Sequence, residues 1–307
     1  MNIIRILKKT YNLAKNKFIK IKLGNLNQHK AIPIKFKKQK IAKKNKKQPR
    51  ISIVIPSYNQ AEFLEKTIKS ILSQKYSNLE LIVQDGGSTD NSVEILKKYE
   101  KHLKHWESKK DGGQSQAINL GFKHSSGEIM AYLNSDDLLL PNSLNYISDY
   151  FLKNPSIDVT YGHRILINEN NDEIGRWVLP PHDCNVLKFA DYIPQETLFW
   201  RKSAWEKAGA KIDESFKFAM DWDLLIRLQN IDAKFHRLPK FIGAFRIHSQ
   251  QKTSSQMDHI GQKEMNKIRF NIHGRTPTQI DIKKATRKYL YKHLIYDLPY
   301  KLKLIRY

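Results

Sequence analysis

The stretch ISIVIPSYNQAEFLEKTIKSILSQ, residues 51–74, decides the fold class. Its first six residues form a short, continuously apolar run rich in β-branched side chains, which is typical of a strand buried in a parallel sheet. After a polar turn, Leu64, Ile68 and Ile71 recur at helical spacing. A buried strand followed at once by an amphipathic helix predicts an α/β protein.

The same alternation of strand and helix continues to about residue 157. Further strands are predicted at 79–84, 105–108 and 128–134, and helices at 88–100, 114–127 and 142–154. Because the connections are short, the expected architecture is a right-handed, doubly wound α/β sheet. Beyond it, short strands and helices are expected around 158–168, 196–202 and 219–230.

Charge divides the chain into three parts. The net charge is +24, and residues 1–50 hold 15 Lys, 2 Arg and no acidic residue. Residues 258–307 hold 12 basic and 4 acidic residues, so residues 51–257 are nearly neutral, with 25 basic and 26 acidic. This predicts a basic arm and linker at 1–50, a globular domain at 51–257 and a basic helical extension at 258–307.

Residues 1–23 carry an apolar stripe at helical spacing beside many lysines. The stripe consists of Ile4, Leu7, Tyr11, Ala14, Phe18 and Ile21. A basic amphipathic helix favours an anionic membrane surface, and the alternative is a helix that packs on the core. Residues 34–50 are expected to be a disordered linker.

The cysteine content and the distribution of apolar residues bear on the cellular compartment of the protein. A single cysteine, Cys184, excludes an intramolecular disulfide and is compatible with a reducing compartment. No run of about 18 apolar residues predicts a transmembrane helix, and the N-terminus lacks the apolar segment of a signal peptide. A cytoplasmic protein, peripheral at the cytoplasmic face of the membrane, is expected.

Three of the predicted strands are followed by polar clusters, at 56–59, 85–88 and 134–137. Ligands of open α/β sheets bind outside the carboxyl ends of the strands, so these clusters are expected to meet at one edge. Asp136 and Asp137 there suit Mg²⁺ or Mn²⁺ bound together with substrate phosphates; the alternative is helix capping. Asp85 is expected to accept hydrogen bonds from a base or ribose, or to stabilise a simple Gly-Gly turn.

The order and spacing of ISIVIPSYNQAEFLEKTIKSILSQ, LELIVQDGGSTDNS and GEIMAYLNSDD resemble the GT-A glycosyltransferases of family 2, from residue 51 to about 253. The resemblance implies a GT-A-type mixed sheet with a Rossmann-like nucleotide-binding half and an acceptor half. It also implies inverting, metal-dependent transfer of a sugar from a nucleotide-diphosphate donor to a hydroxyl of a glycan or lipid-linked acceptor, as in surface polysaccharide or lipopolysaccharide synthesis. A single addition is expected, because the processive Gln-x-x-Arg-Trp motif is absent.

The resemblance also implies roles for individual residues. The nucleotide-sugar site is expected to consist of Pro56, Ser57, Tyr58, Asp85, Asp111, Gln114, Asn119, Asn134 and Ser135. Asn134 replaces the first carboxylate of the family's Asp-x-Asp motif, so Asp136 is the favoured metal ligand, with Asp137 beside it. His248 is assigned to the metal or the diphosphate.

The catalytic base of the resembling enzymes falls on Asp221, in FAMDWDLLIRLQN, where it would accept the proton of the acceptor hydroxyl. The alternative is an N-cap role, because helical spacing begins nearby. The acceptor or phosphate is assigned to Gln195, Glu196, Arg246 and Lys252.

Two other functions are weighed against this interpretation. A nucleotidyltransferase on a similar sheet predicts a glycine-rich loop after the first strand, and SYNQAEF contains no glycine. A nucleic-acid-binding protein predicts aromatic residues interleaved with the lysines, but residues 24–50 contain only Phe36. No nucleic-acid partner is expected.

Overall fold

The computed structural model describes residues 27–34, 48–249, 251 and 257–301. The predicted amphipathic helix at 1–23, residues 35–47 of the predicted linker and Lys252 lie outside the described residues. The interpretations that rest on them remain predictions.

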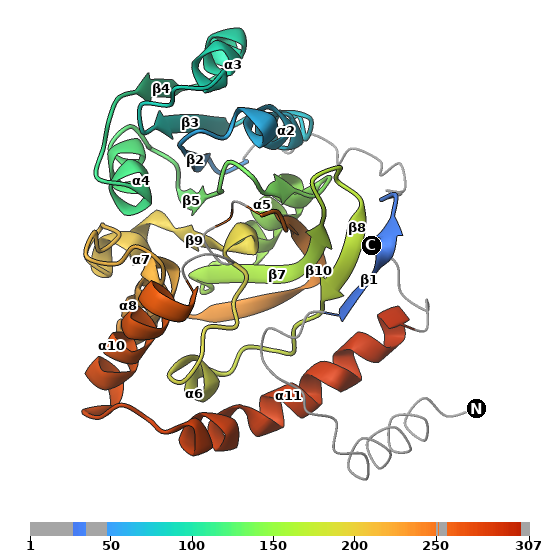
Figure 1. Cartoon of the computed structure of the whole chain (residues 1–307), viewed down its shortest axis with the longest axis vertical. Helices are drawn as coiled ribbons and strands as arrows, with labels where there is room; N and C mark the ends of the chain where they lie inside the picture. The colour runs from blue at the N-terminus through green and yellow to red at the C-terminus, as the bar shows by residue number, and fades with distance from the viewer. Residues whose placement is uncertain (1–26, 35–47, 250, 252–256, 302–307) are drawn as a thin grey trace.

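The described strands form one mixed α/β sheet, as predicted (Figure 1). Its main path has the order β1-β8-β7-β9-β5-β2-β3-β4, and β10 pairs with β6 and β7. The strands are β1 Asn27–Ile32, β2 Ile51–Ser57, β3 Leu79–Asp85, β4 His105–Ser108, β5 Ile129–Tyr132, β6 Leu138–Leu139, β7 Val159–Ile167, β8 Glu173–Trp177, β9 Phe199–Arg201 and β10 Phe235–Arg246.

The strands that open the domain run parallel to one another. β2 pairs in parallel with both β3 and β5, and β3 pairs in parallel with β4. β9 then runs antiparallel to β5 and β7 and joins these parallel strands to the remaining strands. Because β2, β3 and β5 are parallel, their carboxyl ends meet at one edge, as the sequence predicts.

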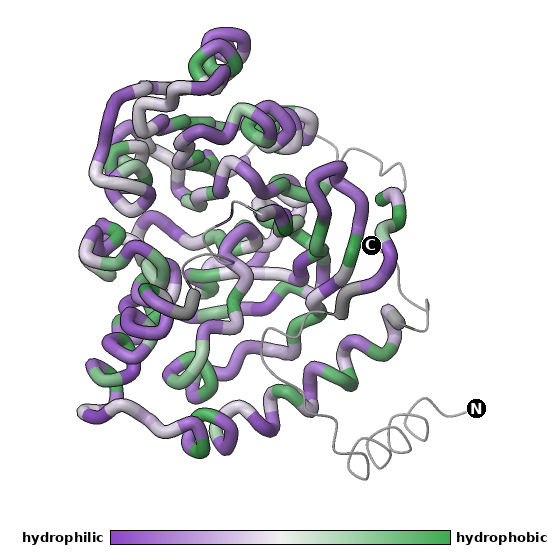
Figure 2. The backbone as a smooth tube through the Cα atoms, in the orientation of Figure 1, coloured by the Kyte–Doolittle hydropathy of each residue, from purple (hydrophilic) through white to green (hydrophobic). Residues whose placement is uncertain are grey.

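The helices cover both faces of the sheet. They are α2 Ala61–Leu72, α3 Ser92–Tyr99, α4 Gln114–Phe122, α5 Ser143–Lys153, α6 Cys184–Leu187, α7 Lys202–Lys207, α8 Met220–Asn230, α10 Gln262–His273 and α11 Gln279–Lys301, with short turns at Glu100–His102, Gln195–Thr197 and Met257–Gly261. Ile53 packs in one core with α2 and α5, whereas its neighbour Val54 packs in a second core that includes Ile268 of α10 and Tyr289 of α11. The central strands are accordingly mostly hydrophobic (Figure 2).

Two features of the fold were not predicted. β1 joins the sheet as an edge strand against β8, although its sequence, NQHKAI, is too polar to suggest a strand. α10 and α11 contribute to the second core, and α11 contacts α6. None of the described helices combines the length and the hydropathy needed to cross a bilayer.

Candidate functional site

A cleft of about 1420 Å³ extends from the carboxyl ends of β2, β3 and β5 to α8, α10 and α11. We call the part beside these strands the sheet end and the part beside the three helices the helical end. Of the residues predicted for function, twelve line the cleft: Pro56, Ser57, Tyr58, Asp111, Gln114, Asn134, Ser135, Asp136, Asp137, Gln195, Glu196 and Asp221. Asp85, Asn119, Arg246 and His248 do not line it.

Two glycines at the sheet end allow a close approach of backbone segments. A Cβ on Gly86 would lie 3.2 Å from an Asp111 carboxylate oxygen, and one on Gly87 would lie 2.9 Å from the Lys110 nitrogen. Gly87 also has a φ of +80°, which favours glycine. The absence of a side chain at Gly86 therefore leaves room for Asp111 beside the end of β3, where both residues line the cleft.

Asp85 and Asn119 make internal hydrogen bonds instead of facing the cleft. The buried Asp85 carboxylate accepts from the Ser88 backbone N–H at 2.8 Å and from the hydroxyls of Ser88 and Ser108. The Asn119 side chain accepts from the Ile212 N–H at 2.7 Å and donates to Glu214. Both side chains thereby fix the segments that surround the sheet end.

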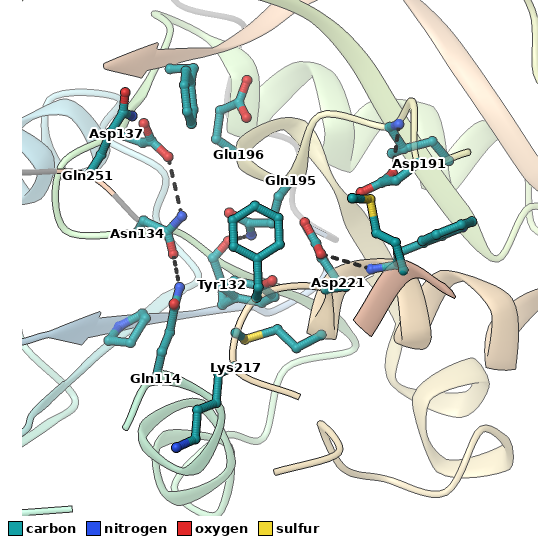
Figure 3. A pocket seen from close by; sticks show the side chains of 18 of the residues that line it. Gln114, Tyr132, Asn134, Asp137, Asp191, Gln195, Glu196, Lys217, Asp221 and Gln251 are labelled. Atoms are coloured by element: carbon teal, nitrogen blue, oxygen red, sulfur yellow. Dashed lines mark hydrogen bonds between the residues drawn. The ribbon is translucent and has the colours of Figure 1, made fainter. Parts of the chain in front are cut away.

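The segment Asn134–Asp137 forms a tight turn directly after β5. The Asp137 N–H donates to the Asn134 carbonyl at 3.1 Å, and the Thr67 hydroxyl of α2 donates to the carbonyls of Ser135 and Asp137. The Asn134 amide oxygen accepts from the Gln114 side chain at 2.7 Å (Figure 3). The turn is therefore held from both neighbouring helices, α2 and α4.

The two adjacent carboxylates of this turn have different surroundings. Asp137 is buried and its Oδ1 accepts from the Arg246 N–H at 3.0 Å. Burial, followed by the nearby Asp136 and Glu196 carboxylates, raises the pKa of Asp137 well above its ordinary value. Asp136 keeps 20% of its side chain exposed, and its Oδ2 lies 3.0 Å from His248 Nε2. Both line the cleft, and Asp136 is the more exposed carboxylate of the pair.

The predicted metal ligands do not converge on a common point. No group of three or more His, Cys, Asp or Glu side chains within the described residues is arranged to hold a metal ion. Asp137 accepts from the Arg246 N–H and from the Asn134 side chain, whereas Asp136 and His248 are in contact with each other. A carboxylate and an imidazole are suitable donors for Mn²⁺ or Mg²⁺ when substrate oxygens complete the coordination.

Arg246 makes its hydrogen bonds within the protein, mainly to backbone carbonyls. Its guanidinium donates to the carbonyls of Asp136 and Asn168 at 2.7 and 2.8 Å and to the Asn171 side chain at 2.7 Å. It is buried below the turn that carries Asp136. This arrangement makes Arg246 a support of the turn in this structure.

Asp221 lies in the first turn of α8 and faces the cleft (Figure 3). The N-cap residue of α8 is Ala219, so the N-cap alternative for Asp221 is wrong. Asp221 Oδ1 accepts from the Trp222 N–H at 2.9 Å. Burial raises the pKa of Asp221 to about 6, against the opposing effects of that hydrogen bond and of the Arg164 charge.

A second carboxylate, Asp191, lies opposite Asp221 and was not predicted. It lines the same part of the cleft, and its carboxylate accepts from the Ile193 N–H at 3.2 Å. Burial and the Asp221 carboxylate raise the pKa of Asp191 well above its ordinary value. Two carboxylates with raised pKa values, placed together in a cleft, are typical of a site of proton transfer.

Arg164 and Glu196 form an ion pair in the wall of the cleft. Arg164 of β7 donates through both Nε and Nη2 to the two carboxylate oxygens of Glu196, whose side chain is fully buried. Arg164 also packs over the Phe245 ring at 4.5 Å. It lowers the pKa values of Asp137, Asp191 and Asp221, so it is the main cation of the site.

Gln195 and Ser57 each present a buried polar atom without a partner. Gln195 donates to the Tyr132 carbonyl at 2.8 Å, but its Oε1 accepts no hydrogen bond from the described residues. The Ser57 hydroxyl is likewise without a described partner. Both residues line the cleft, so a polar ligand is expected to complete their hydrogen bonds.

Comparisons with known proteins agree on one family. Residues 52–214, just over half of the chain, match the family model described as Glycosyl transferase family 2. The chain is 27% identical over 230 residues to an uncharacterized glycosyltransferase of Rickettsia typhi, which covers 72% of this chain and 71% of that protein.

A second relative has a more specific name. The chain is 36% identical over 131 residues to the Escherichia coli UDP-Glc:alpha-D-GlcNAc-diphosphoundecaprenol beta-1,3-glucosyltransferase WfgD, covering 42% of this chain and 51% of that protein. The matched region thus spans about half the length of WfgD. Among solved structures, the mannosyltransferase PcManGT of Pyrobaculum calidifontis, in complex with GDP-Man and Mn²⁺, superposes with a TM-score of 0.57 at 17% identity, covering 95% of this chain and 78% of the other.

Proposed function

The chain belongs to glycosyl transferase family 2, and we propose that it transfers a sugar, with inversion, from a nucleoside-diphosphate donor to a hydroxyl of a glycan or lipid-linked acceptor. It is therefore an enzyme of the glycosyltransferase type, on a GT-A-type fold. Family membership decides against the nucleotidyltransferase and nucleic-acid alternatives. The observation that carries the proposal is that Asp221 shares one cleft with the polar residues at the strand ends.

The sheet end is the proposed donor site. Ser57, Tyr58 and Asp111 line it, and the unpartnered Ser57 hydroxyl is available to a ligand. Tyr58 keeps 61% of its surface exposed, which suits stacking on a base or ribose. Complexes of the similar PcManGT with GDP-Man support a nucleotide-sugar donor for this chain.

Asp136 and His248 are the proposed protein ligands of a divalent cation, with Asn134 close by. A bound cation would supply positive charge to the diphosphate as the leaving group departs. Asp137 is assigned a supporting role, because its carboxylate is buried and hydrogen-bonded to the Arg246 backbone. The Mn²⁺ of the PcManGT complex supports a metal ion for this chain.

Asp221 is the proposed general base. Inversion requires the acceptor oxygen to attack the anomeric carbon opposite the leaving diphosphate, while a base on the acceptor side removes its proton. Gln195 Oε1 is free to accept from a sugar hydroxyl in the same region. Asp191 lines the same cleft, and the Asp221 carboxylate contributes to raising its pKa.

Replacing Asp136 by alanine is expected to weaken metal-dependent nucleotide binding by more than about 10-fold, because even partners of metal ligands are typically worth 10- to 100-fold in affinity. Calorimetry with UDP and GDP, with and without Mn²⁺, measures the effect. Asp149→Ala serves as the control, because it removes a carboxylate of α5 that lies outside the cleft. If Asp136→Ala and the wild type show the same metal-dependent gain in affinity, Asp136 is not a metal ligand.

Surface polysaccharide or lipopolysaccharide synthesis is the proposed setting, at the cytoplasmic face of the membrane. The acceptor named for WfgD is a sugar attached to diphosphoundecaprenol, which supports a lipid-linked acceptor for this chain. The basic arm at 1–23 is the proposed contact with anionic lipid.

Full-length protein is expected to co-sediment with phosphatidylglycerol vesicles more than a variant that lacks residues 1–23. Each lysine near an anionic surface contributes roughly 1 kcal/mol, and salt should weaken the attraction. Leu7→Asp together with Phe18→Asp tests the apolar stripe at fixed lysine content. Equal partitioning of full-length and truncated protein would instead favour the exposed face of α11, which carries Tyr291 and Tyr296, as the contact; Tyr289, considered from the sequence, is buried in the core.

A further inference from the structure

The helical end of the cleft contains a buried cation with no counter-ion. Arg269 of α10 lines the cleft and is only 7% exposed. Its Nε donates to the Phe189 carbonyl at 2.9 Å, its Nη1 donates to the Asn266 side chain at 3.0 Å, and its guanidinium packs 5.3 Å from the centroid of the Trp222 ring. Within the described part of the chain, no Asp or Glu forms an ion pair with it.

The nearby carboxylates do not neutralise this charge. Arg164, and not Arg269, is the cation that lowers the pKa values of Asp191 and Asp221. The pKa of Arg269 itself is lowered by burial alone. An isolated charge removed from water is destabilising unless it is paired, so a ligand of opposite charge would offset this effect.

Arg269 also has N–H donors that make no hydrogen bond to a described residue. A guanidinium has five N–H groups in a planar fork, and the described partners use two of them. The Nη2 group donates to no described residue. A planar fork with free donors matches the paired oxygens of a phosphate group.

Other residues at this end complete an anion site with an apolar extension. Lys217 and Lys283 line the same cleft and are exposed, with no described acidic partner. Met265 lies one turn before Arg269 on α10, and Ile282, Thr286 and Leu290 follow one another at helical spacing on α11. Both helices therefore present a mixed basic and apolar face to the cleft.

We propose that the acceptor substrate carries a phosphate group and that Arg269, assisted by Lys217 and Lys283, binds this phosphate while the acceptor hydroxyl is presented to Asp221. The inference rests on the proposed function, because it assigns the helical end to the acceptor. Two acceptors share this chemistry: a sugar joined through a diphosphate to a lipid, and a glycan that contains phosphate.

Binding to the protein with a filled donor site tests the proposal. The protein is saturated with UDP or GDP and Mn²⁺ and then titrated with farnesyl diphosphate, inorganic pyrophosphate and farnesol. Arg269→Gln is expected to weaken binding of both phosphate ligands roughly 10-fold or more, as loss of a charged hydrogen bond does. Lys263→Gln, which removes an exposed charge from α10 outside the cleft, should bind them like the wild type.

The three ligands distinguish the two sources of phosphate. Farnesyl diphosphate binding much tighter than pyrophosphate supports a lipid-linked acceptor, and equal affinities support a phosphate-containing glycan. Arg269-independent binding of both phosphate ligands overturns the proposal. A merely structural Arg269 would lower the melting temperature and leave these affinities unchanged in the folded protein.

Two further measurements test the anion site and the proposed glycosyltransferase function separately. If Arg269→Gln does not fold, the double variant Lys217→Gln/Lys283→Gln decides, because both side chains are exposed; unchanged phosphate affinity there overturns the proposal. Failure of the wild type to bind UDP or GDP argues against the proposed function. The anion site is then judged by Arg269-dependent binding of pyrophosphate without nucleotide.

Discussion

Asp221→Asn is expected to lower kcat by roughly 10²–10⁴-fold, the usual contribution of a positioned general base, while the affinity for the donor stays near that of the wild type. The amide is nearly the same size as the carboxylate but does not accept the acceptor proton. Its side-chain oxygen is still able to accept from the Trp222 N–H, so the start of α8 should be preserved. Steady-state kinetics together with donor calorimetry measure the two quantities.

The neighbouring Asp223 provides the matched control. It lies in the same helical turn, but its carboxylate pairs with Arg227 Nε at 2.8 Å instead of facing the cleft. Asp223→Asn is expected to affect the melting temperature and not kcat. Wild-type turnover in Asp221→Asn would remove Asp221 from catalysis.

The pH profile provides a second check on Asp221. A base acts in its ionised form, and burial raises the pKa of Asp221 to about 6. Turnover of the wild type should therefore fall as the pH drops through about 6, whereas the residual activity of Asp221→Asn should lack this acidic limb.

The sequence predicts the first half of the fold because its signals are local. β2, β3 and β5 are short, mainly apolar runs, and the helices between them repeat at helical spacing, so each element is visible within its own segment. The rule that ligands bind at the carboxyl ends of parallel strands then brings Ser57 and Asn134 to one edge. Both residues do line the cleft.

The second half of the site depends on contacts between distant segments. Glu196 was expected to face the acceptor, but its ion pair with Arg164, 32 residues earlier in the sequence, was not predicted. Asp191 follows a segment without helical or strand periodicity. Its pKa depends on Asp221 of α8, which is distant in sequence. Arg269 lies in a basic segment whose composition suggests a solvated surface, and only the packing of α10 against Trp222 buries it. Pattern reasoning therefore identified Asp221 and Glu196 but not Arg164, Asp191 or Arg269 beside them.

Glu196→Gln is expected to destabilise the fold by about 3–5 kcal/mol, because it leaves Arg164 deep in the wall without its counter-ion. A change of that size should lower the melting temperature by roughly 6–20 °C. The exposed pair Glu94–Lys97 is the control, since Glu94→Gln removes only a surface interaction worth at most about 1 kcal/mol. Thermal melts compare the two variants.

The Arg164–Glu196 pair should also set the acidic limb of the activity. The Glu196 charge raises the pKa of Asp221 and the Arg164 charge lowers it. Glu196→Gln should therefore lower the pKa of Asp221 and extend activity to lower pH, whereas Arg164→Met should raise it and shift the limb to higher pH. The double variant Arg164→Met/Glu196→Met should recover much of the lost stability, because no buried charge of the pair remains. A variant Glu196→Gln that melts like the wild type but binds acceptor weakly would instead assign Glu196 to acceptor binding.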